Sequence, residues 1–259
     1  MAIRFLPKWR KLRVALAICA LPVAAAAQQE TAPRPALIIA YHTAPTNWLA
    51  FRAALERDVL PRLDHLQNEG VLRDFHLFLA RDVDAEGWNT MAVLDFNGVK
   101  GRTRWDVASR ITPAGLNQQE LALTTRIDST PVNLMREGTD DSKPDHPVFV
   151  IIPYRVIVSD DAYLKYLDGY TVPQLEGWKS AGILPRYSIY MGQYPAGRPW
   201  TAMLVLEYSG DRALAKRDAV KARVRETLAH DPAWKAISED KSNIRAELSA
   251  AVADEAKPQ

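Results

Sequence analysis

The chain has 259 residues, of which 47% are hydrophobic and 25% charged, and one cysteine, a composition that excludes a disordered chain and a disulfide-rich scaffold. The formal net charge is +2, but the segment 1–27 contains five basic side chains and no acidic one. Without this segment, 28 basic side chains stand against 31 acidic ones, which argues against a nucleic acid or an acidic membrane surface as the main partner.

The N-terminus has the pattern of a secretory signal peptide. Residues 1–13 are basic, residues 14–27 are apolar, and Ala25 to Ala27 provide the small side chains expected before a cleavage site at Gln28. The apolar run is shorter than the roughly 20 residues that cross a bilayer. The sequence therefore predicts a periplasmic or secreted protein that has no membrane contact after signal cleavage.

The single cysteine, Cys19, lies within this signal. The bulky Ile18 before it argues against cleavage and lipidation at that point. A mature chain that begins at Gln28 has no cysteine, which suits an oxidising compartment and excludes thiol nucleophiles, thiolate zinc sites and iron–sulfur clusters. Residues 28–36 are polar and are expected to form a flexible lead-in.

Residues 37–137 predict one unit with the order strand, helix, strand, strand, helix, strand. Runs rich in β-branched residues indicate the strands, and a helical pattern that ends at Gly70, where a left-handed cap is favourable, indicates the first helix. Pro61 lies inside this helix and is expected to kink or break it. The expected strands are 37–43, 72–81, 89–97 and 127–136, and the expected helices are 48–68 and 102–125.

The same unit recurs over residues 147–250. Val59–Gly98 aligns without a gap on Thr171–Gly210, at a constant numbering offset of 112 and with nine of 40 positions identical, which indicates a duplication. A polar linker, 138–146, is expected between the units, and a tail over 251–259. The expected strands are 148–158, 184–193, 201–209 and 243–252, the last of which could equally be helix, and the expected helices are 160–180 and 211–239.

The order βαββαβ, present twice, is that of the ferredoxin-like split βαβ unit. One face of each sheet lies under helices, and the other face needs a second cover. Two such sheets can cover each other. The sequence therefore predicts an α+β fold in which two tandem ferredoxin-like units form an intramolecular pseudo-dimer, with the sheets face to face or closed into a barrel and the helices outside.

The sequence resembles the dimeric α/β-barrel superfamily, and within it the NIPSNAP-like and EthD-like groups, over residues 37–250. The resemblance rests on the duplicated frame, on the segments NEGVLRDFHLF and SAGILPRYSIY, and on the D-P-x-W segment Asp231–Trp234. It implies the fold and a barrel cavity. It implies no catalytic residue, because the superfamily includes cofactor-independent monooxygenases, haem proteins, lyases and proteins without an assigned activity.

Strand alternation selects the side chains that face the space between the sheets. Asp95 and Glu207 occupy matching positions in the two units, and a buried acid with a raised pKa is a natural general base. The alternative is an acid near a strand end that reaches water or pairs with an arginine. Asp74 lies on the same interior face. On the first strands His42 aligns with Tyr154 at the offset of 112 and Arg155 follows, but alternation leaves open which way these side chains face. The candidate catalytic residues are Asp95 and Glu207, and the candidate ligand-binding residues are His42, His76, Tyr154, Arg155, Arg186 and Tyr190.

No metal and no cofactor are expected. A facial triad of His42, His76 and Asp95 would suit iron. However, the antiparallel first and third strands would place His42 and Asp95 three to four residues apart, roughly 10 to 13 Å. Haem binding stays open through the resemblance, since some two-copy barrels carry an axial histidine on a helix of the second copy. His230 is the only histidine in the corresponding region of this sequence, and its capping-type setting favours a surface position.

The sequence contains no P-loop, G-x-G-x-x-G, H-E-x-x-H or G-x-S-x-G motif. Our leading hypothesis is an exported soluble protein that binds a small, partly apolar molecule between the two sheets, and whether it is an enzyme stays open. One alternative is a cofactor-independent monooxygenase- or isomerase-type enzyme, with Asp95 or Glu207 as base and Arg155 or Arg186 stabilising an anion. Another is a structural or interaction protein without a ligand cavity. Further homo-oligomerisation is compatible with each.

Overall fold

The computed structural model describes residues 33–257 with the exception of 83, 85–86 and 141. The predicted signal peptide, Cys19 and the predicted cleavage before Gln28 lie outside the described residues, so these remain predictions. Within the described ranges, no helix has the length and apolar character needed to cross a membrane.

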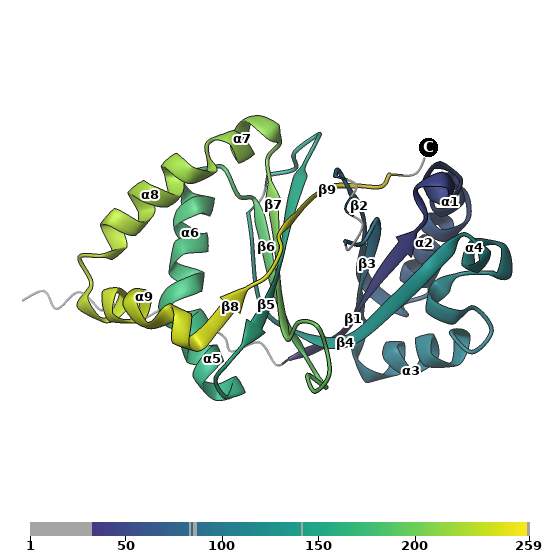
Figure 1. The fold of residues 1–259 in the computed structure, drawn as a ribbon, viewed down its shortest axis with the longest axis horizontal. Helices are drawn as coiled ribbons and strands as arrows, with labels where there is room; N and C mark the ends of the chain where they lie inside the picture. Colours follow the sequence, from purple (N-terminus) through teal and green to yellow (C-terminus); the bar gives the residue numbers. More distant parts are fainter. Residues whose placement is uncertain (1–32, 83, 85–86, 141, 258–259) are drawn as a thin grey trace, which may run out of the picture. The chain divides into compact units, whose positions relative to one another are not determined.

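Antiparallel strands form a closed eight-stranded barrel (Figure 1). The strands are β1 (Arg34–Thr43), β2 (Leu72–Ala80), β3 (Thr90–Phe96), β4 (Thr124–Thr139), β5 (Val148–Val156), β6 (Arg186–Gly192), β7 (Ala202–Tyr208), β8 (Arg245–Glu247) and β9 (Ala251–Glu255). Their spatial order is β7-β6-β4-β1-β3-β2-β9-β5, and the pairing of β7 with β5 closes the ring. The short strand β8 pairs with the far end of β5.

The last strand of each half closes the barrel against the other half. The 16-residue strand β4 pairs with β1 along one edge and with β6 along the other, and β9 pairs with both β2 and β5. Gly138 and Thr139, expected in the linker, therefore belong to β4. The final strand, expected over 243–252, is instead divided into β8 and β9, so residues 251–255 are part of the barrel rather than of a tail.

Pro61, and Pro173 at the matching position of the second predicted helix, are accommodated without ending the helix. Each follows one π-helical turn, η2 (Leu55–Val59) before Pro61 and η4 (Leu167–Thr171) before Pro173. A wider turn is a reasonable response to a residue that lacks the N–H donor and crowds the preceding turn. These helical regions are η1 (Pro45–Asn47), α1 (Trp48–Ala54) and α2 (Leu60–Asn68) in the first half, and α5 (Asp160–Tyr166) and α6 (Val172–Ser180) in the second.

The left-handed helix ends predicted from the sequence are confirmed, with φ of 68° at Gly70 and 73° at Gly182. The second helical region of each half is more divided than expected. It consists of α3 (Gly98–Ala108), η3 (Pro113–Gly115) and α4 (Gln118–Ala122) in the first half, and of α7 (Asp211–Ala215), α8 (Arg217–Leu228) and α9 (Pro232–Ile244) in the second.

Three buried clusters hold the fold together. Two lie between the barrel wall and the helices, which cover its outer faces (Figure 1). The third fills the barrel interior and includes Phe78, Met91, Tyr190 and Met203. The faces predicted for β2, β3, β6 and β7 are thus confirmed, because alternate residues of these strands enter the interior cluster and their neighbours pack under helices.

Candidate functional site

Charged side chains gather at one end of the barrel interior, which we call the polar end. Each is placed there by strand alternation, because its neighbours in sequence point toward the helices or the solvent. The polar end consists of Asp74 and His76 on β2, Asp95 on β3, Arg186 on β6, Glu207 on β7 and Glu255 on β9.

An ion-paired chain of four side chains crosses the polar end. Arg186 Nη2 donates to Asp74 Oδ2 at 3.0 Å, and Arg186 Nη1 lies 3.3 Å from His76 Nε2. His76 Nδ1 lies 2.6 Å from Glu255 Oε1. Burial lowers the pKa of His76, but the hydrogen bond with Glu255 and the charges of Glu255 and Asp74 outweigh this effect and raise it overall. All four side chains keep some exposure, so they form the outer layer of the polar end.

Asp95 lies beneath this layer and is only 8% exposed. The Tyr190 hydroxyl donates to Asp95 Oδ2 at 3.4 Å, whereas Asp95 Oδ1 has no hydrogen-bond partner among the described residues. Burial raises the pKa of Asp95 to about 6, against a lowering influence of His76. Burial also raises the pKa of Glu207, opposed by Arg186. Asp95 is therefore a buried carboxyl with a raised pKa, one of the two alternatives that the sequence left open.

The space inside the barrel is small. Side chains at the polar end surround a cavity of about 10 Å³, room for about one water molecule. Cavities that bind drug-sized molecules usually measure about 300 to 1,000 Å³. The facing side chains therefore fill most of the space that the sequence analysis assigned to a ligand. The lining includes four of the predicted site residues, His76, Arg186, Tyr190 and Glu207.

Tyr154 does not face the barrel interior, and its prediction as an inter-sheet residue is wrong. Ala36 pairs with Asp95 and Phe149 with Glu207, so the first strands of the two halves match at a numbering offset of 113 rather than 112. A shift of one residue turns a side chain to the other face of a strand. Tyr154 consequently packs on the helix side, where the Arg245 guanidinium carbon lies 4.0 Å from the centroid of its ring.

His42 and Arg155 lie toward the other end of the barrel. Asp95 pairs with Ala36, six residues before His42 on β1, which corresponds to roughly 20 Å rather than the expected 10 to 13 Å. His42 instead contacts the Gly87 carbonyl at 2.9 Å and Asp128 Oδ2 at 3.0 Å. Arg155 is exposed and donates to the Pro199 carbonyl.

The described residues offer neither a metal site nor a haem site of the kind considered from the sequence. No group of three or more His, Cys, Asp or Glu side chains among them is arranged to hold a metal ion. His230 is exposed, and its Nδ1 lies 3.1 Å from the Thr227 carbonyl. The cavity between helices and sheet in the second half measures about 50 Å³, too small for a haem, and it has no histidine in its lining. These residues do not fit a haem group.

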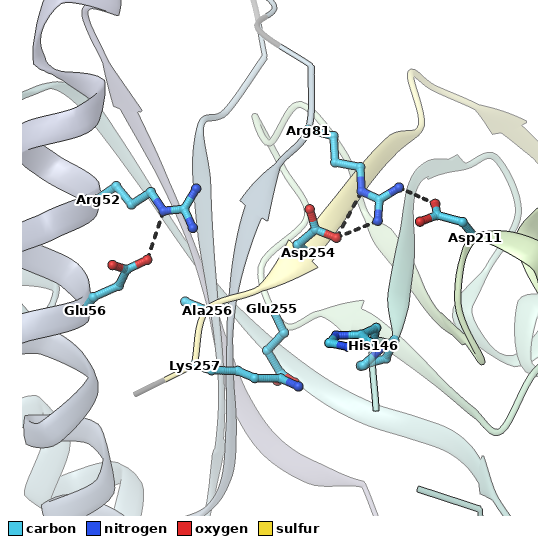
Figure 2. Close-up of a pocket in the computed structure, with 10 residues that line it drawn as sticks. Arg52, Glu56, Arg81, His146, Asp211, Asp254, Glu255, Ala256 and Lys257 are labelled. Atoms are coloured by element: carbon cyan, nitrogen blue, oxygen red, sulfur yellow. Dashed lines mark hydrogen bonds and ion pairs between the residues drawn. The ribbon is translucent and has the colours of Figure 1, made fainter. Parts of the chain in front are cut away.

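A larger groove of about 430 Å³ lies beside the polar end and was not predicted (Figure 2). Its charged side chains are largely paired with one another: Arg81 bridges Asp211 and Asp254, and Arg52 contacts Glu56. Glu255 lines the groove and also contacts His76, so it separates the groove from the polar end. No sequence pattern predicted the groove, because its walls depend on the position of β9.

Comparisons with known proteins identify the fold. No family model and no curated protein matches the chain. Among solved structures, a candidate monooxygenase of Fusobacterium nucleatum has a TM-score of 0.55 at 10% identity, covering 86% of this chain and 93% of that one. An anthrone oxidase-like protein has a TM-score of 0.54 at 11% identity, covering 87% and 92%. A chlorite dismutase variant from Candidatus Nitrospira defluvii has a TM-score of 0.51 at 10% identity, covering 88% and 93%. The chain shares the dimeric α+β-barrel fold with them.

Proposed function

We propose that this protein binds a small, partly apolar molecule at the polar end of its barrel, with Asp95 as the acceptor of a proton from the ligand. The observation that carries the proposal is the state of Asp95: it is buried, has a pKa of about 6 and keeps one carboxyl oxygen without a partner among the described residues. Retaining an acid there is unfavourable for folding, and such positions are frequent at functional sites.

The neighbours of Asp95 supply the rest of a complementary surface. Arg186 Nε is a buried donor without a partner in the described chain, so the polar end offers one free acceptor and one free donor. Phe78 and Phe149, whose ring centroids are 4.7 Å apart, provide an apolar surface beside them. A compact ligand with an acidic hydroxyl group, such as a phenol or an enol, matches this combination.

The ligand must displace side chains, because the cavity holds about one water. The proposal requires the outer layer to move. Its side chains, Asp74, His76, Arg186 and Glu255, keep between 15% and 32% of their surface exposed. Opening the Arg186–Asp74 pair would free the guanidinium to stabilise a ligand anion. Proton removal by Asp95 with the anion held by Arg186 is also the first step required of a cofactor-independent isomerase or monooxygenase, the enzymatic form of this proposal.

We further infer that the chain is a tandem pair of ferredoxin-like units. In the first half the strand order is β4-β1-β3-β2, and in the second β5 lies between β8/β9 and β7, with β6 next. Asp74 and Arg186, which contact each other, are separated by the same offset as the sequence repeat, as expected of equivalent positions near a pseudo-two-fold axis. Membership of the NIPSNAP-like or EthD-like groups, and export, rest on the sequence segments alone.

A filled barrel without a ligand is the second candidate, favoured by the small interior cavity. Its function would then lie in surface contacts.

The amount of ligand that the purified wild type and its charge-removing variants retain distinguishes the two candidate functions. We expect mass spectrometry to find a small molecule on the purified wild-type protein, and Asp95→Asn to lower its retention at least tenfold. Glu207→Gln should have a smaller effect, since Glu207 is less buried. Asp254→Asn, on the outer surface, is the matched control and should retain the ligand. A wild-type protein without ligand, or equal retention in Asp95→Asn and Asp254→Asn, would favour the filled barrel.

A further inference from the structure

A second cavity, of about 50 Å³, lies outside the barrel, between α6, α8 and the sheet of the second half. By the measure that assigns about 10 to 15 Å³ to one water, it has room for about four. Its lining combines an apolar floor, including Leu175 and Trp178, with four basic side chains, Arg217, Lys221, Arg225 and Arg245. Glu247 is the single acidic side chain in this lining.

Several buried donors that line this cavity lack a partner. Among the described residues, the Tyr170 hydroxyl and Trp178 Nε1 have no hydrogen-bond partner. Arg217 Nε also meets no acceptor in good geometry, although the Arg217 side chain interacts with the Tyr208 hydroxyl. Buried polar atoms are nearly always hydrogen-bonded, and an exception calls for an explanation. These groups can donate, so a ligand with acceptor atoms in this cavity would provide the partners that the chain does not.

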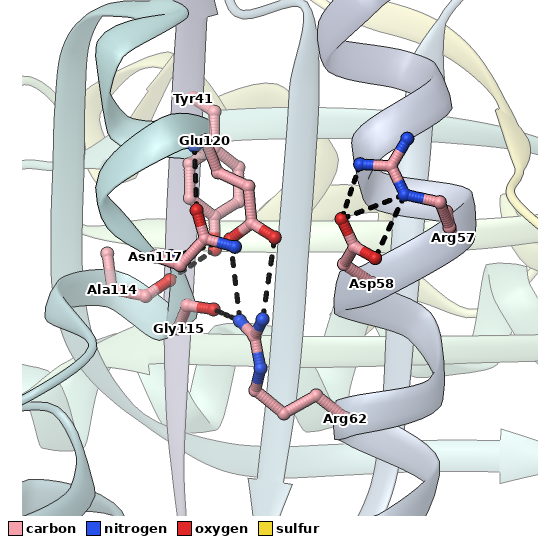
Figure 3. Close-up of polar contacts among 8 residues, drawn as sticks. All are labelled: Tyr41, Arg57, Asp58, Arg62, Ala114, Gly115, Asn117 and Glu120. Atoms are coloured by element: carbon pink, nitrogen blue, oxygen red, sulfur yellow. Dashed lines mark hydrogen bonds and ion pairs between the residues drawn. The ribbon is translucent and has the colours of Figure 1, made fainter.

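The corresponding region of the first half contains its own anion (Figure 3). Glu120 on α4 is only 1% exposed and faces the Arg62 guanidinium, with oxygen–nitrogen distances of 3.4 and 3.5 Å. Arg62 also donates to the Gly115 carbonyl, and Glu120 completes a capping box with Asn117. The cation of this half is therefore balanced by a carboxylate that the chain supplies.

In the second half a glutamine takes the place of the Arg62 cation, and the basic side chains of the cavity lie on α8 and β8 instead, with the exposed Glu247 as the one acid in the lining. Gln174 is the counterpart of Arg62 in the sequence repeat, and its Oε1 accepts from Arg225 Nε at 2.7 Å. Its Nε2 donates to the Tyr170 carbonyl at 3.0 Å. The link between the two helical regions is thus preserved, but the charge on the later helix has changed from negative to positive.

The basic side chains of this cavity also crowd one another. Burial lowers the pKa of Lys221, and the charges of Arg225 and Arg217 lower it further, although Asp218 and Glu247 act in the opposite direction. Arg245 is occupied by Tyr166, whose hydroxyl accepts from its Nε at 2.7 Å, and by Glu247 at 3.6 Å. Arg217, Lys221 and Arg225 are therefore the cations that an added anion would relieve.

We propose that this cavity binds a compact organic carboxylate, with the carboxylate held by Arg217, Lys221 and Arg225 and the apolar body against Trp178 and Leu175. The ligand supplies the negative charge that Glu120 supplies in the first half. Guanidinium groups suit this role, because their planar donors match the two oxygens of a carboxylate. The site is independent of the polar end, so this proposal does not rest on the proposed function.

Benzoate is a suitable probe, since Trp178 reports its binding by tryptophan fluorescence. We expect saturable binding of one benzoate per chain, measured by fluorescence and by calorimetry, and no binding of benzamide, which has the same ring without the charge. Arg217→Gln and Lys221→Gln should each weaken benzoate binding at least tenfold. Arg223→Gln, an exposed position on the same helix, is the matched control and should bind as the wild type does.

Thermal unfolding of each variant shows that lost binding is not lost folding, and Lys221→Gln keeps the test informative if Arg217→Gln fails to fold. Equal binding of benzoate and benzamide, equal weakening by Arg223→Gln, or tighter competitive binding of inorganic phosphate would overturn the assignment of a carboxylate site. The absence of saturable benzoate binding would overturn it as well.

Discussion

Replacing Ala253 with aspartate should lower the free energy of unfolding by about 3 to 5 kcal/mol, the usual range for an uncompensated buried charge. Ala253 lies in the middle of β9, is 0% exposed and belongs to the cluster that fills the barrel. It pairs with Ala80 on β2 and with Phe149 on β5, so it lies at the point where β9 closes the ring. A carboxylate there would face apolar side chains.

Asp254→Ala is the matched control for this prediction. The side chain of Asp254 points outward, is 53% exposed and pairs with Arg81, so its loss should change the free energy by less than about 1 kcal/mol. Urea denaturation of both variants measures the difference. Size-exclusion chromatography should show self-association of Ala253→Asp alone, because a displaced β9 exposes the edges of β2 and β5. Similar unfolding midpoints for the two variants would contradict the role assigned to β9.

The sequence predicted local structure well because the local signals agree with one another. Alternation of polar and apolar residues gave the correct faces for β2, β3, β6 and β7, and the glycines at the helix ends gave the correct left-handed caps. Pro61 was the local exception. The sequence predicted a kink or a break there. The helix continues past Pro61 after one π-helical turn, a feature that no residue pattern predicts.

Errors at the site come from register and from pairing between distant segments. His42 was aligned with Tyr154, but the gapless alignment begins after the first strand, and the two strands differ by one residue. That single shift exchanges the two faces. Asp74 was assigned to the interior face but not to the site, and Glu255 was placed in a tail. Their contacts with Arg186 and His76 join residues 112 and 179 positions apart.

The strand pairings that close the barrel could not be derived from local patterns either, because they join distant segments. Both the crossing of β4 to β6 and that of β9 to β2 are long-range pairings, which depend on how the two halves meet. The volume of the barrel interior could not be predicted from local patterns either. The sequence identified which side chains face inward, but their combined packing leaves only about 10 Å³, a result of the detailed fit of rings such as Phe78 and Phe149.

Asp95 links the proposed function to stability through its raised pKa. Its folded-state pKa of about 6 lies above the ordinary value of 3.8, so the folded state binds the proton more tightly than the unfolded state does. The favourable contribution is complete below about pH 4 and is lost as the pH rises toward and through 6. At pH 7 the difference of roughly two pKa units corresponds to about 3 kcal/mol of lost stability, as an upper value.

Asp95→Asn should therefore make the protein more stable at pH 7, by up to about 3 kcal/mol, while it lowers ligand retention at least tenfold. Asparagine is neutral at every pH and can still accept from the Tyr190 hydroxyl, so the buried charge is removed without loss of that contact. Urea denaturation at intervals between pH 4 and 7 measures the effect. The wild type should lose stability relative to the variant as the pH rises through this range, with the steepest change between 3.8 and 6, near pH 5, and a levelling off above 6. A wild type and a variant with parallel pH profiles would show that Asp95 titrates as an ordinary surface acid, and the polar end would then lose its candidate base.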